Sequence, residues 1–296
     1  MVTFVYILLC IRKINMTKEF VLNIIQQSRE DTRIFLTEFV KRLDFSKEEH
    51  RFLYDQTMIR IFGKNSLGFA QTLEHQVLDF TRVRKCCCKG TLFNNISELI
   101  YPPARNTKIG RANLDNETVF YCSNDPGTSI FEVRPKLGDW IATTTFRNDK
   151  KSMKSIVLGA DTYKLKEFNN LPPYLQGVHD FLNDIFVEEI KEGQEYNYYK
   201  TASICKSMIG NTNSILYPSF ASKLKGWNYV FSVNEFNESF KFVESRIQEV
   251  TEFKSPFEFK VKCLYRAISV DKFKDLKWEK YTPECKGHNI DDMIYE

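Results

Sequence analysis

Residues 110–135 read GRANLDNETVFYCSNDPGTSIFEVRP, and this stretch decides the fold. It carries Arg111, Tyr121 and Glu132, which are separated by ten and eleven positions. The segment ETVFYCS has the pattern of a short strand, with Val119 and Tyr121 on one face and their neighbours on the other. The pattern therefore predicts a strand that directs Tyr121 to one side of a sheet.

The residues after this strand predict a short helix of about two turns. In NDPGTSIFEVRP, Asp125 suits the N-cap, and Pro126 suits the first helical position. Pro135 disfavours helical backbone at the residue before it, so the helix is expected to stop there. We therefore expect Glu132 near the end of this helix.

The three side chains together suit a phosphorylated nucleoside with a scissile glycosidic bond. The fork of donors on Arg111 can clamp a phosphate, and Tyr121 offers a flat face and a hydroxyl. Glu132 can accept hydrogen bonds from sugar hydroxyls and stabilise positive charge at an anomeric carbon. The same spacing also fits a surface arginine, a core tyrosine and a helix-end glutamate, so spacing alone leaves both interpretations open.

The residues before this stretch are predicted to be helical as far as residue 78. Apolar side chains recur at helical intervals in EFVLNIIQQSREDTRIFLTEFVKRL. Ser46 and Glu49 have the spacing of a capping box. A third helix is expected over residues 66–78, and we interpret the apolar stripe of this region as packing surface.

The apolar stretch at residues 2–11 is too short to span a bilayer, which needs about 20 residues. It also lacks the leading positive charges and the small-residue cleavage site of a signal peptide. Thr17 suits a helix N-cap directly after Met16. Either Met16 is the true start, or residues 1–15 are a buried strand or an appendage. The sequence predicts no membrane association.

The residues after the quoted stretch alternate between strands and helices without a regular βαβα rhythm. DWIATTTF, SILYPSF, WNYVFSV and FEFKVKCLYRAIS predict strands, because they are rich in β-branched and aromatic residues or alternate in polarity. PPYLQGVHDFLNDIF and YNYYKTASICKSMIG have helical spacing. This arrangement predicts the α+β class rather than a doubly wound sheet.

Composition narrows the class of protein further. The 296 residues are 43% hydrophobic, enough for one large domain or two modest ones. The net charge of +4 comes from 42 basic and 38 acidic residues, a mixture too even to indicate nucleic-acid binding. The eight cysteines form no CxxC pair, and the four histidines are scattered, so no metal site is predicted. A reduced, cytoplasmic location is expected.

IGRANLDNETVFYCSNDPGTSIFEVRP resembles the core of the RES domain family. That pattern reads Gly-Arg-x-Asn, a turn, an apolar strand ending in Tyr, a small helix carrying Glu, and often Arg-Pro. Upstream, DFTRVRK resembles the family's opening aromatic-x-Arg strand. Downstream, SILYPSFASKLKGWNYVF is similar to its later strand, which ends in Tyr-x-Ser and is followed by an Asn and an apolar strand. These segments occur in the family's order over residues 80–232.

The resemblance implies an ADP-ribosyltransferase-like mixed β core with surrounding helices, here preceded by a small helical N-terminal region. We expect three segments. Residues 1–78 are the helical N-terminal region, residues 79–235 the catalytic domain, and residues 236–296 a C-terminal α/β extension.

The resemblance also implies an NAD-degrading enzyme, with NAD as substrate and no separate cofactor. Such proteins break the nicotinamide–ribose bond and pass the ADP-ribosyl group to phosphate, water or sometimes a protein, and many are bacterial toxins paired with an antitoxin. In DFTRVRK, Arg82 matches the arginine of the family's opening aromatic-x-Arg strand, and Arg84 is the alternative. Carried over by motif position, the catalytic residues are Arg111, Tyr121 and Glu132, and the substrate-binding residues are Arg82, Asn113 and Ser219.

Two other interpretations stay open. The same site fits a protein mono-ADP-ribosyltransferase. A catalytically silent interaction module, with the N-terminal helices as its working surface, is the alternative from another class. The extra residues on both sides of the RES-like core exceed what a minimal toxin needs, which makes a separately encoded antitoxin a less secure expectation.

Overall fold

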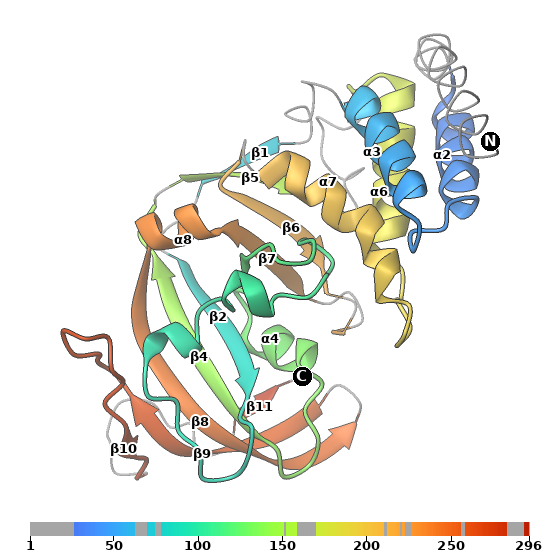
Figure 1. The fold of residues 1–296 in the computed structure, drawn as a ribbon. Helices are drawn as coiled ribbons and strands as arrows, with labels where there is room; N and C mark the ends of the chain where they lie inside the picture. Colours follow the sequence, from blue (N-terminus) through green and yellow to red (C-terminus); the bar gives the residue numbers. More distant parts are fainter. Residues whose placement is uncertain are drawn as a thin grey trace.

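Two β-sheets form the centre of the protein and bring distant parts of the chain together (Figure 1). The first sheet has the strand order β1-β5-β6-β7-β3, and the second has the order β10-β9-β8-β4-β2, with β11 paired to β9. The described strands pair antiparallel except for β5 and β6, which run parallel. The computed structural model describes residues 27–62, 70–74, 78–150, 152–158, 170–209, 212–219, 221–222, 226–255, 258–282 and 293–295.

The strands are spread over most of the chain. The first sheet uses β1 (Ala70–Glu74), β3 (Val119–Cys122), β5 (Ser152–Val157), β6 (Ser214–Pro218) and β7 (Trp227–Ser232). The second uses β2 (Leu78–Lys85), β4 (Trp140–Asn148), β8 (Phe240–Ser255), β9 (Glu258–Ala267), β10 (Glu279–Lys280) and β11 (Met293–Tyr295).

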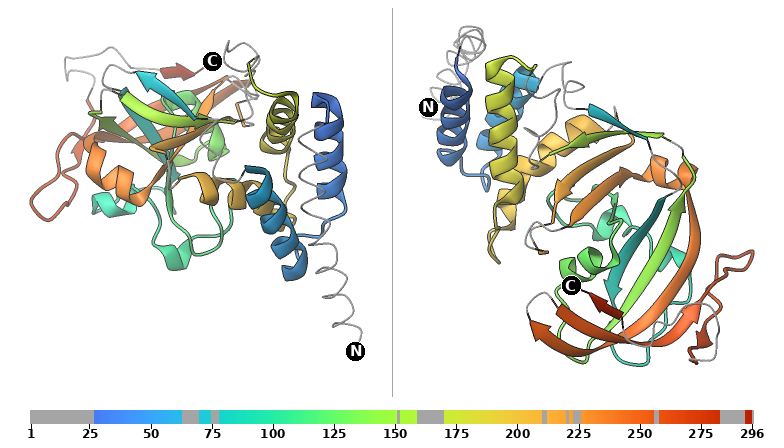
Figure 2. Two further views of the ribbon diagram at one scale, coloured as in Figure 1. Left: turned by 90° about the horizontal axis from the view of Figure 1, so that it is seen from above. Right: turned by 180° about the vertical axis from the view of Figure 1, so that it is seen from behind.

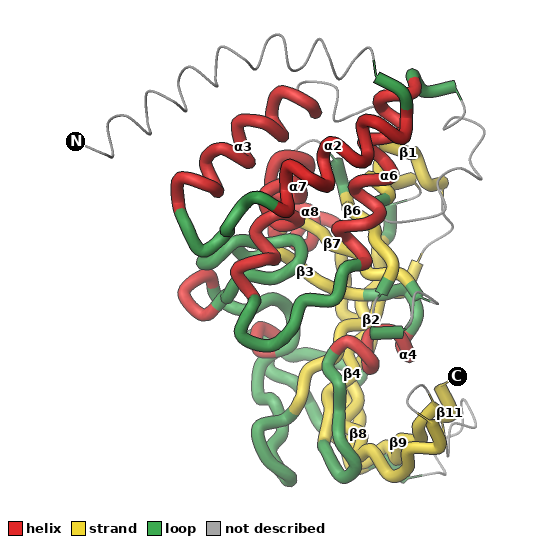
Figure 3. The backbone as a smooth tube through the Cα atoms, turned by 90° about the vertical axis from the view of Figure 1, so that its right-hand side faces the viewer, coloured by secondary structure: helices red, strands yellow, loops and turns green. Residues whose placement is uncertain are grey.

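The helices gather mainly at one end of the molecule, where α2, α3, α6 and α7 lie together (Figure 3). The α-helices are α2 (Arg29–Lys41), α3 (Glu48–Phe62), α4 (Pro126–Glu132), α6 (Pro173–Val187), α7 (Tyr199–Ile209) and α8 (Val233–Ser239). Short 3₁₀ turns occur at η2 (Ile96–Glu98), η3 (Ala104–Asn106) and η5 (Glu195–Tyr198).

The quoted stretch folds as its sequence predicts. β3 and α4 follow one another, and the carboxylate of Asp125 caps α4 by accepting hydrogen bonds from the N–H groups of Gly127 at 3.2 Å and Thr128 at 2.7 Å. Pro126 takes the first helical position and Glu132 is the last helical residue. The local pattern therefore places Tyr121 on a strand and Glu132 at the end of the next helix.

Alternation along the strands of the first sheet places their side chains in two different apolar clusters. Val119 and Tyr121 of β3 belong to the cluster between the first sheet and the helices, whereas Phe120 belongs to the cluster between the two sheets. On β6, Tyr217 faces the helices and Leu216 faces the second sheet. Figure 2 shows from two sides that α6 and α7 lie on the face of the first sheet away from the second.

The N-terminal helices pack on the helices that cover the first sheet. α2 lies along α6, where Arg29 pairs with Asp180 at 2.5 Å and Arg33 with Asp184 at 2.8 Å. Gly177 on α6 permits the close approach, because a Cβ added there would lie 2.2 Å from a backbone oxygen of α2. α2 and α6 therefore pack closely along each other, while α3 packs on α7.

Two details of the N-terminal prediction are wrong. The third helix is absent from the described part of residues 66–78, because Ala70–Glu74 forms β1 and pairs with β5, and β2 begins at Leu78. Pairing with β5 satisfies the peptide groups that a helix would have satisfied internally. Ser46 makes no capping box either: its N–H and hydroxyl both donate to Asp44, and α3 begins at Glu48.

The fold belongs to the α+β class, as predicted, with mixed and antiparallel sheets beside helices. β8 follows residue 236 and pairs with β4, so the second sheet draws strands from both sides of the expected boundary near residue 235. The division into residues 1–78, 79–235 and 236–296 stays a prediction. The predictions for residues 1–26 lie outside the described residues. None of the described helices has the length and apolar character needed to cross a membrane.

Candidate functional site

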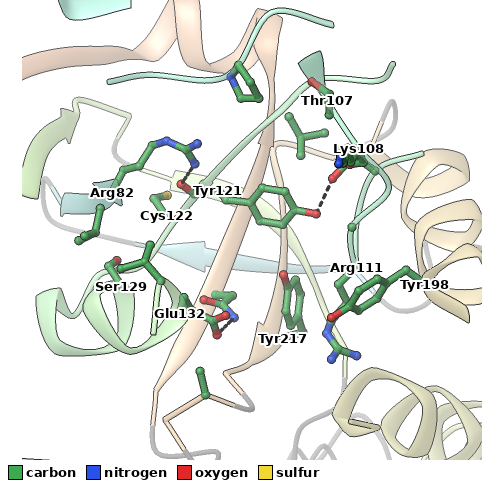
Figure 4. Close-up of a pocket in the computed structure, with 18 of the residues that line it drawn as sticks. Arg82, Thr107, Lys108, Arg111, Tyr121, Cys122, Ser129, Glu132, Tyr198 and Tyr217 are labelled. Atoms are coloured by element: carbon green, nitrogen blue, oxygen red, sulfur yellow. Dashed lines mark hydrogen bonds between the residues drawn. The ribbon is translucent and has the colours of Figure 1, made fainter. Parts of the chain in front are cut away.

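A cavity of about 450 Å³ opens beside the quoted stretch, at the ends of β6 and β7 (Figure 4). This volume lies within the range of about 300–1,000 Å³ that is typical of small-molecule sites. The lining also includes the loop before β3 and the linker between α6 and α7. The expected site residues that line it are Arg82, Arg111, Asn113, Tyr121 and Glu132.

Tyr121 holds the loop that carries Arg111. Its hydroxyl accepts a hydrogen bond from the N–H of Ala112 at 2.7 Å and donates to Asn113 Oδ1 at 2.9 Å. Burial raises the pKa of Tyr121 well above its usual value, so the hydroxyl stays neutral. Gly110 is required here, because a Cβ on this residue would lie 2.9 Å from Asn113 Oδ1. The Gly-Arg-x-Asn pattern thus builds a loop locked onto β3.

Asn113 is a structural part of this loop. The side chain is almost fully buried, and its Nδ2 donates to the carbonyl oxygens of Lys108 at 2.9 Å and Leu114 at 3.0 Å. Its Oδ1 accepts a hydrogen bond from the Tyr121 hydroxyl, so the described hydrogen bonds of this side chain all go to other protein groups. Asn113 therefore shapes the cavity wall and orients Tyr121.

Glu132 is fixed through one of its two carboxylate oxygens. Oε1 accepts hydrogen bonds from Ser219 Oγ at 2.5 Å and Asn228 Nδ2 at 2.7 Å. Among the described residues, no donor reaches Oε2. The carboxylate is thus held in one orientation while its second oxygen is free for a ligand.

Ser219 occupies a different place from the one expected of a substrate-binding residue. It is fully buried and does not line the cavity, and its Oγ also accepts a hydrogen bond from the N–H of Ser222 at 3.1 Å. Its contact with Glu132 makes it a positioning residue for the carboxylate. Asn228 has the same contact and lines the cavity, yet sequence reasoning assigned it no role. The Asn that follows Tyr-x-Ser in the family pattern was the available signal.

The geometry favours Arg82 over Arg84 as the cavity arginine. Arg82 lines the cavity, donates to the carbonyl of Tyr121 at 2.9 Å and lies over the ring of Phe120 at 5.9 Å. Its Nε is buried without a partner among the described residues. Burial, with a smaller contribution from Arg84, lowers the pKa of Arg82 to about 10, so it remains a cation at neutral pH. Arg84 instead donates to the carbonyl of Glu98 and lies outside the lining.

Arg111 lies at the C-terminal end of α6. Its guanidinium donates to the carbonyl oxygens of Glu188 at 3.0 Å and Ile185 at 3.5 Å, where a cation complements the free carbonyls of a helix end. The guanidinium also lies 5.4 Å from the ring centroid of Tyr198, which lines the cavity from η5. Figure 4 shows Arg82 and Arg111 on opposite sides of Tyr121.

The charges of these side chains are uncompensated within the described part of the chain. Arg82 and Arg111 form no ion pair with a carboxylate there, and Glu132 forms none with a cation. Arg82 and Arg111 are partly buried whereas Glu132 is exposed, so the unpaired charges cost most at the arginines, where a complementary ligand would offset that cost. The site is therefore suited to a ligand with an anionic part and a part that develops positive charge. Arg134, which the Pro135 context would place in solvent, is exposed but also lines the cavity.

Other chemistries find no support in the described ranges. These residues contain no group of three or more His, Cys, Asp or Glu side chains arranged to hold a metal ion. The exposed Cys87 and Cys88 lie outside the cavity lining. The candidate chemistry thus rests on the arginines, Tyr121 and Glu132.

Comparison with known protein families gives a match to the RES domain over residues 88–252, more than half of the chain. The matched segment contains Arg111, Asn113, Tyr121, Glu132 and Ser219, begins after Arg82, and extends past residue 235 into β8. Comparison with curated proteins gives no match.

Proposed function

The chain belongs to the RES domain family, which is known from NAD-related toxin–antitoxin systems, and we propose that it is an enzyme that cleaves the nicotinamide–ribose bond of NAD. Phosphate or water takes the ADP-ribosyl group. One observation carries this proposal: Arg82 and Arg111, which have no carboxylate partner among the described residues, line the same cavity as Glu132, which has no cationic partner there. NAD offers a pyrophosphate to the arginines and a ribose that becomes cationic to the carboxylate.

In this proposal Glu132 acts on the nicotinamide ribose. Its Oε2 accepts hydrogen bonds from ribose hydroxyls and stabilises the oxocarbenium-like transition state. The bond between the anomeric carbon and nicotinamide breaks, and its electron pair leaves with nicotinamide. An oxygen of phosphate or water then bonds to the anomeric carbon, and an attacking water gives up one proton to the solvent. Because the nicotinamide of NAD is already cationic, it leaves as a neutral molecule without further activation.

The remaining residues bind and orient the substrate. Arg82 and Arg111 bind pyrophosphate oxygens, and the ring of Tyr121 packs on the nicotinamide ribose side of NAD. Ser219 and Asn228 hold Glu132 through Oε1, which keeps Oε2 directed at the substrate. The loop locked by Tyr121 and Asn113 keeps Arg111 in place. The proposed partners are therefore NAD and inorganic phosphate, with an antitoxin protein as a further proposal.

The test is incubation of the purified chain with NAD, with and without phosphate, and identification of the products. We expect nicotinamide in both reactions, ADP-ribose without phosphate, and its 1″-phosphorylated form where phosphate is the acceptor. Label transferred from NAD to protein would instead indicate a mono-ADP-ribosyltransferase. A folded protein that leaves NAD intact under every acceptor condition would exclude the proposed activity and leave an interaction module.

The toxin proposal has a separate cellular test. Production of an NAD-degrading toxin should lower the NAD content of the host cell and slow growth, and the Glu132→Gln variant should do neither. Normal NAD content during production of a folded, active enzyme would argue against a toxic role.

A further inference from the structure

Tyr217 presents a hydroxyl to the cavity that the proposed mechanism does not use. The residue lies on β6, is 4% exposed and belongs to the cavity lining. Its ring packs in the core, 5.7 Å from that of Phe186. Among the described residues, no donor or acceptor forms a hydrogen bond with its hydroxyl. The hydroxyl is not one of the fully buried polar atoms without a partner in the described chain, so it reaches the cavity and can donate to a ligand bound there.

The surroundings of this hydroxyl indicate what kind of ligand it takes. Figure 4 shows Tyr217 between Glu132 and Arg111, with its hydroxyl directed toward the Tyr121 side of the cavity. Arg111 is a cation whose protein hydrogen bonds go only to backbone carbonyls within the described chain. A neutral hydroxyl donor beside such a cation favours an anionic oxygen.

The hydroxyl keeps its proton in this setting. Burial, reinforced by the nearby charge of Glu132, raises the pKa of Tyr217 well above its usual value, although Arg111 acts in the opposite direction. The group is therefore a hydrogen-bond donor throughout the neutral pH range.

We propose that the Tyr217 hydroxyl and the Arg111 guanidinium together bind a phosphate group of the reactants. This inference rests on the proposed function and adds a second donor to the arginine contact. Two reactants carry the required chemistry, namely the pyrophosphate of NAD and the inorganic phosphate that accepts the ADP-ribosyl group. Tyr217 is thus a substrate-binding residue that the Tyr-x-Ser end of β6 brings beside Glu132.

The test compares Tyr217→Phe with a matched control, Tyr229→Phe. Tyr229 lies on the neighbouring strand β7, is 6% exposed, and packs between the two sheets, outside the cavity lining. Both variants remove one oxygen from a buried ring. Binding of ADP-ribose and of inorganic phosphate is measured by calorimetry for wild type and both variants, with thermal melting as the test of folding.

We expect Tyr217→Phe to weaken binding by about 10- to 100-fold, the effect of losing one hydrogen bond to a charged group. Weaker binding of ADP-ribose assigns the contact to the pyrophosphate, and weaker binding of phosphate alone assigns it to the acceptor. In turnover assays, a contact with the pyrophosphate raises the KM for NAD even without phosphate. A contact with the acceptor raises only the phosphate concentration needed for half-maximal phosphorolysis. Tyr229→Phe should match wild type in each measurement.

Three outcomes would overturn the inference. The first is that Tyr217→Phe binds both molecules as wild type does, and the second is that wild type binds neither. The third is a melting temperature that falls further in Tyr217→Phe than in Tyr229→Phe, which would make the hydroxyl structural. Because these measurements need no turnover, they separate this inference from the proposed activity: an inactive wild type that still binds ADP-ribose through Tyr217 contradicts only the latter.

Discussion

The two sides of the cavity are built in different ways. The carboxylate wall, made of Glu132 with Ser219 and Asn228, is held by side-chain hydrogen bonds of 2.5 and 2.7 Å. The arginine wall, made of Arg111 and Tyr198, is held by bonds from Arg111 to the carbonyls at the end of α6 and by the ring of Tyr198. One wall fixes a single side chain, whereas the other depends on where a helix ends.

This difference shows what the N-terminal helices contribute. The end of α6 holds Arg111 and Tyr198 lies directly before α7, and these two helices pack against α2 and α3. Lys200 on α7 pairs with Glu188, whose carbonyl accepts a bond from Arg111, and the hydroxyl of Tyr54 on α3 donates to the carbonyl of Lys200 at 2.7 Å. Helices that precede the family match therefore brace one wall of the site, although they line no part of the cavity.

The largest effect is expected from the carboxylate wall. Glu132→Gln keeps an oxygen for Ser219 and Asn228 but removes the negative charge that stabilises the developing cation. Loss of such an electrostatic contribution costs about 10²–10³ in rate. We expect kcat for NAD cleavage to fall by this factor while the melting temperature stays close to that of wild type.

The control for this variant is Glu189→Gln, which removes a carboxylate from the same cavity on the side of the α6–α7 linker. It should reduce turnover far less, because no hydrogen bond from the described residues fixes Glu189 as Ser219 and Asn228 fix Glu132. Wild-type turnover in Glu132→Gln would remove Glu132 from the mechanism.

The next effect tests the arginine wall. Arg111→Lys keeps the charge but loses the planar fork of donors that bonds both the helix-end carbonyls and a phosphate. We expect the KM for NAD to rise by about 10- to 100-fold, which corresponds to the loss of one charge-assisted hydrogen bond. Steady-state kinetics and thermal melting measure the two consequences separately.

Arg147→Lys is the matched control, because Arg147 makes a bidentate contact with Asp79, at 2.7 and 2.9 Å, outside the cavity lining. Arg134 is unsuitable as a control because it lines the cavity. If Arg111→Lys loses activity only in proportion to its stability, Arg111 serves to cap α6 rather than to bind NAD.

The sequence predicted well the features of the site that depend on neighbouring residues. The Asp125 cap, the end of α4 at Glu132 and the alternation of Val119 and Tyr121 follow from neighbouring residues, and all three are confirmed. The partners of Glu132 lie 87 and 96 positions away along the chain, so no short pattern specifies their contacts.

The contacts that hold Arg111 in the arginine wall could not be predicted, for a related reason. The carbonyls that bind Arg111 lie 74 and 77 positions further along, and a backbone carbonyl leaves no mark in the residue pattern. β1 was missed because its pairing with β5 joins segments about 80 residues apart, and that pairing outweighs local helical spacing. Motif position predicted a substrate-binding role for Ser219, and only the fold shows that its hydroxyl is turned toward Glu132.

A smaller effect is expected in how the stability of the folded protein depends on pH. His179 on α6 is buried, and burial lowers its pKa from 6.5 to about 4, although Asp180 acts in the opposite direction. Between these values the unfolded chain binds a proton that the folded chain does not, so stability falls as pH falls from about 6.5 toward 4. The slope approaches about 1.4 kcal/mol per pH unit.

Urea unfolding at several pH values between 4.5 and 7.5 measures this slope. His179→Gln removes the titrating group and should flatten the slope in that window. An unchanged slope in His179→Gln would show that other groups cause the acid sensitivity.

The smallest effect tests whether the N-terminal helices reach the site through α7. Tyr54→Phe removes the hydroxyl that donates to the buried Lys200 carbonyl, which keeps only its bond within α7. The expected cost is about 1 kcal/mol, which lowers the melting temperature of a chain of this size by about 2–4 °C. Because Lys200 pairs with Glu188, we also expect weaker apparent affinity for NAD with kcat unchanged.

Tyr101→Phe is the control for this last variant, since it loses a hydroxyl bond to Asn237, 3.0 Å long, on the far side of the first sheet from α6 and α7. It should change the melting temperature by a similar or smaller amount without changing the KM for NAD. A raised KM in Tyr54→Phe alone shows that the arginine wall depends on α3. Equal KM values in the two variants would mean that the wall is set by α6 and its linker alone, and that the N-terminal helices contribute stability but no geometry to the site.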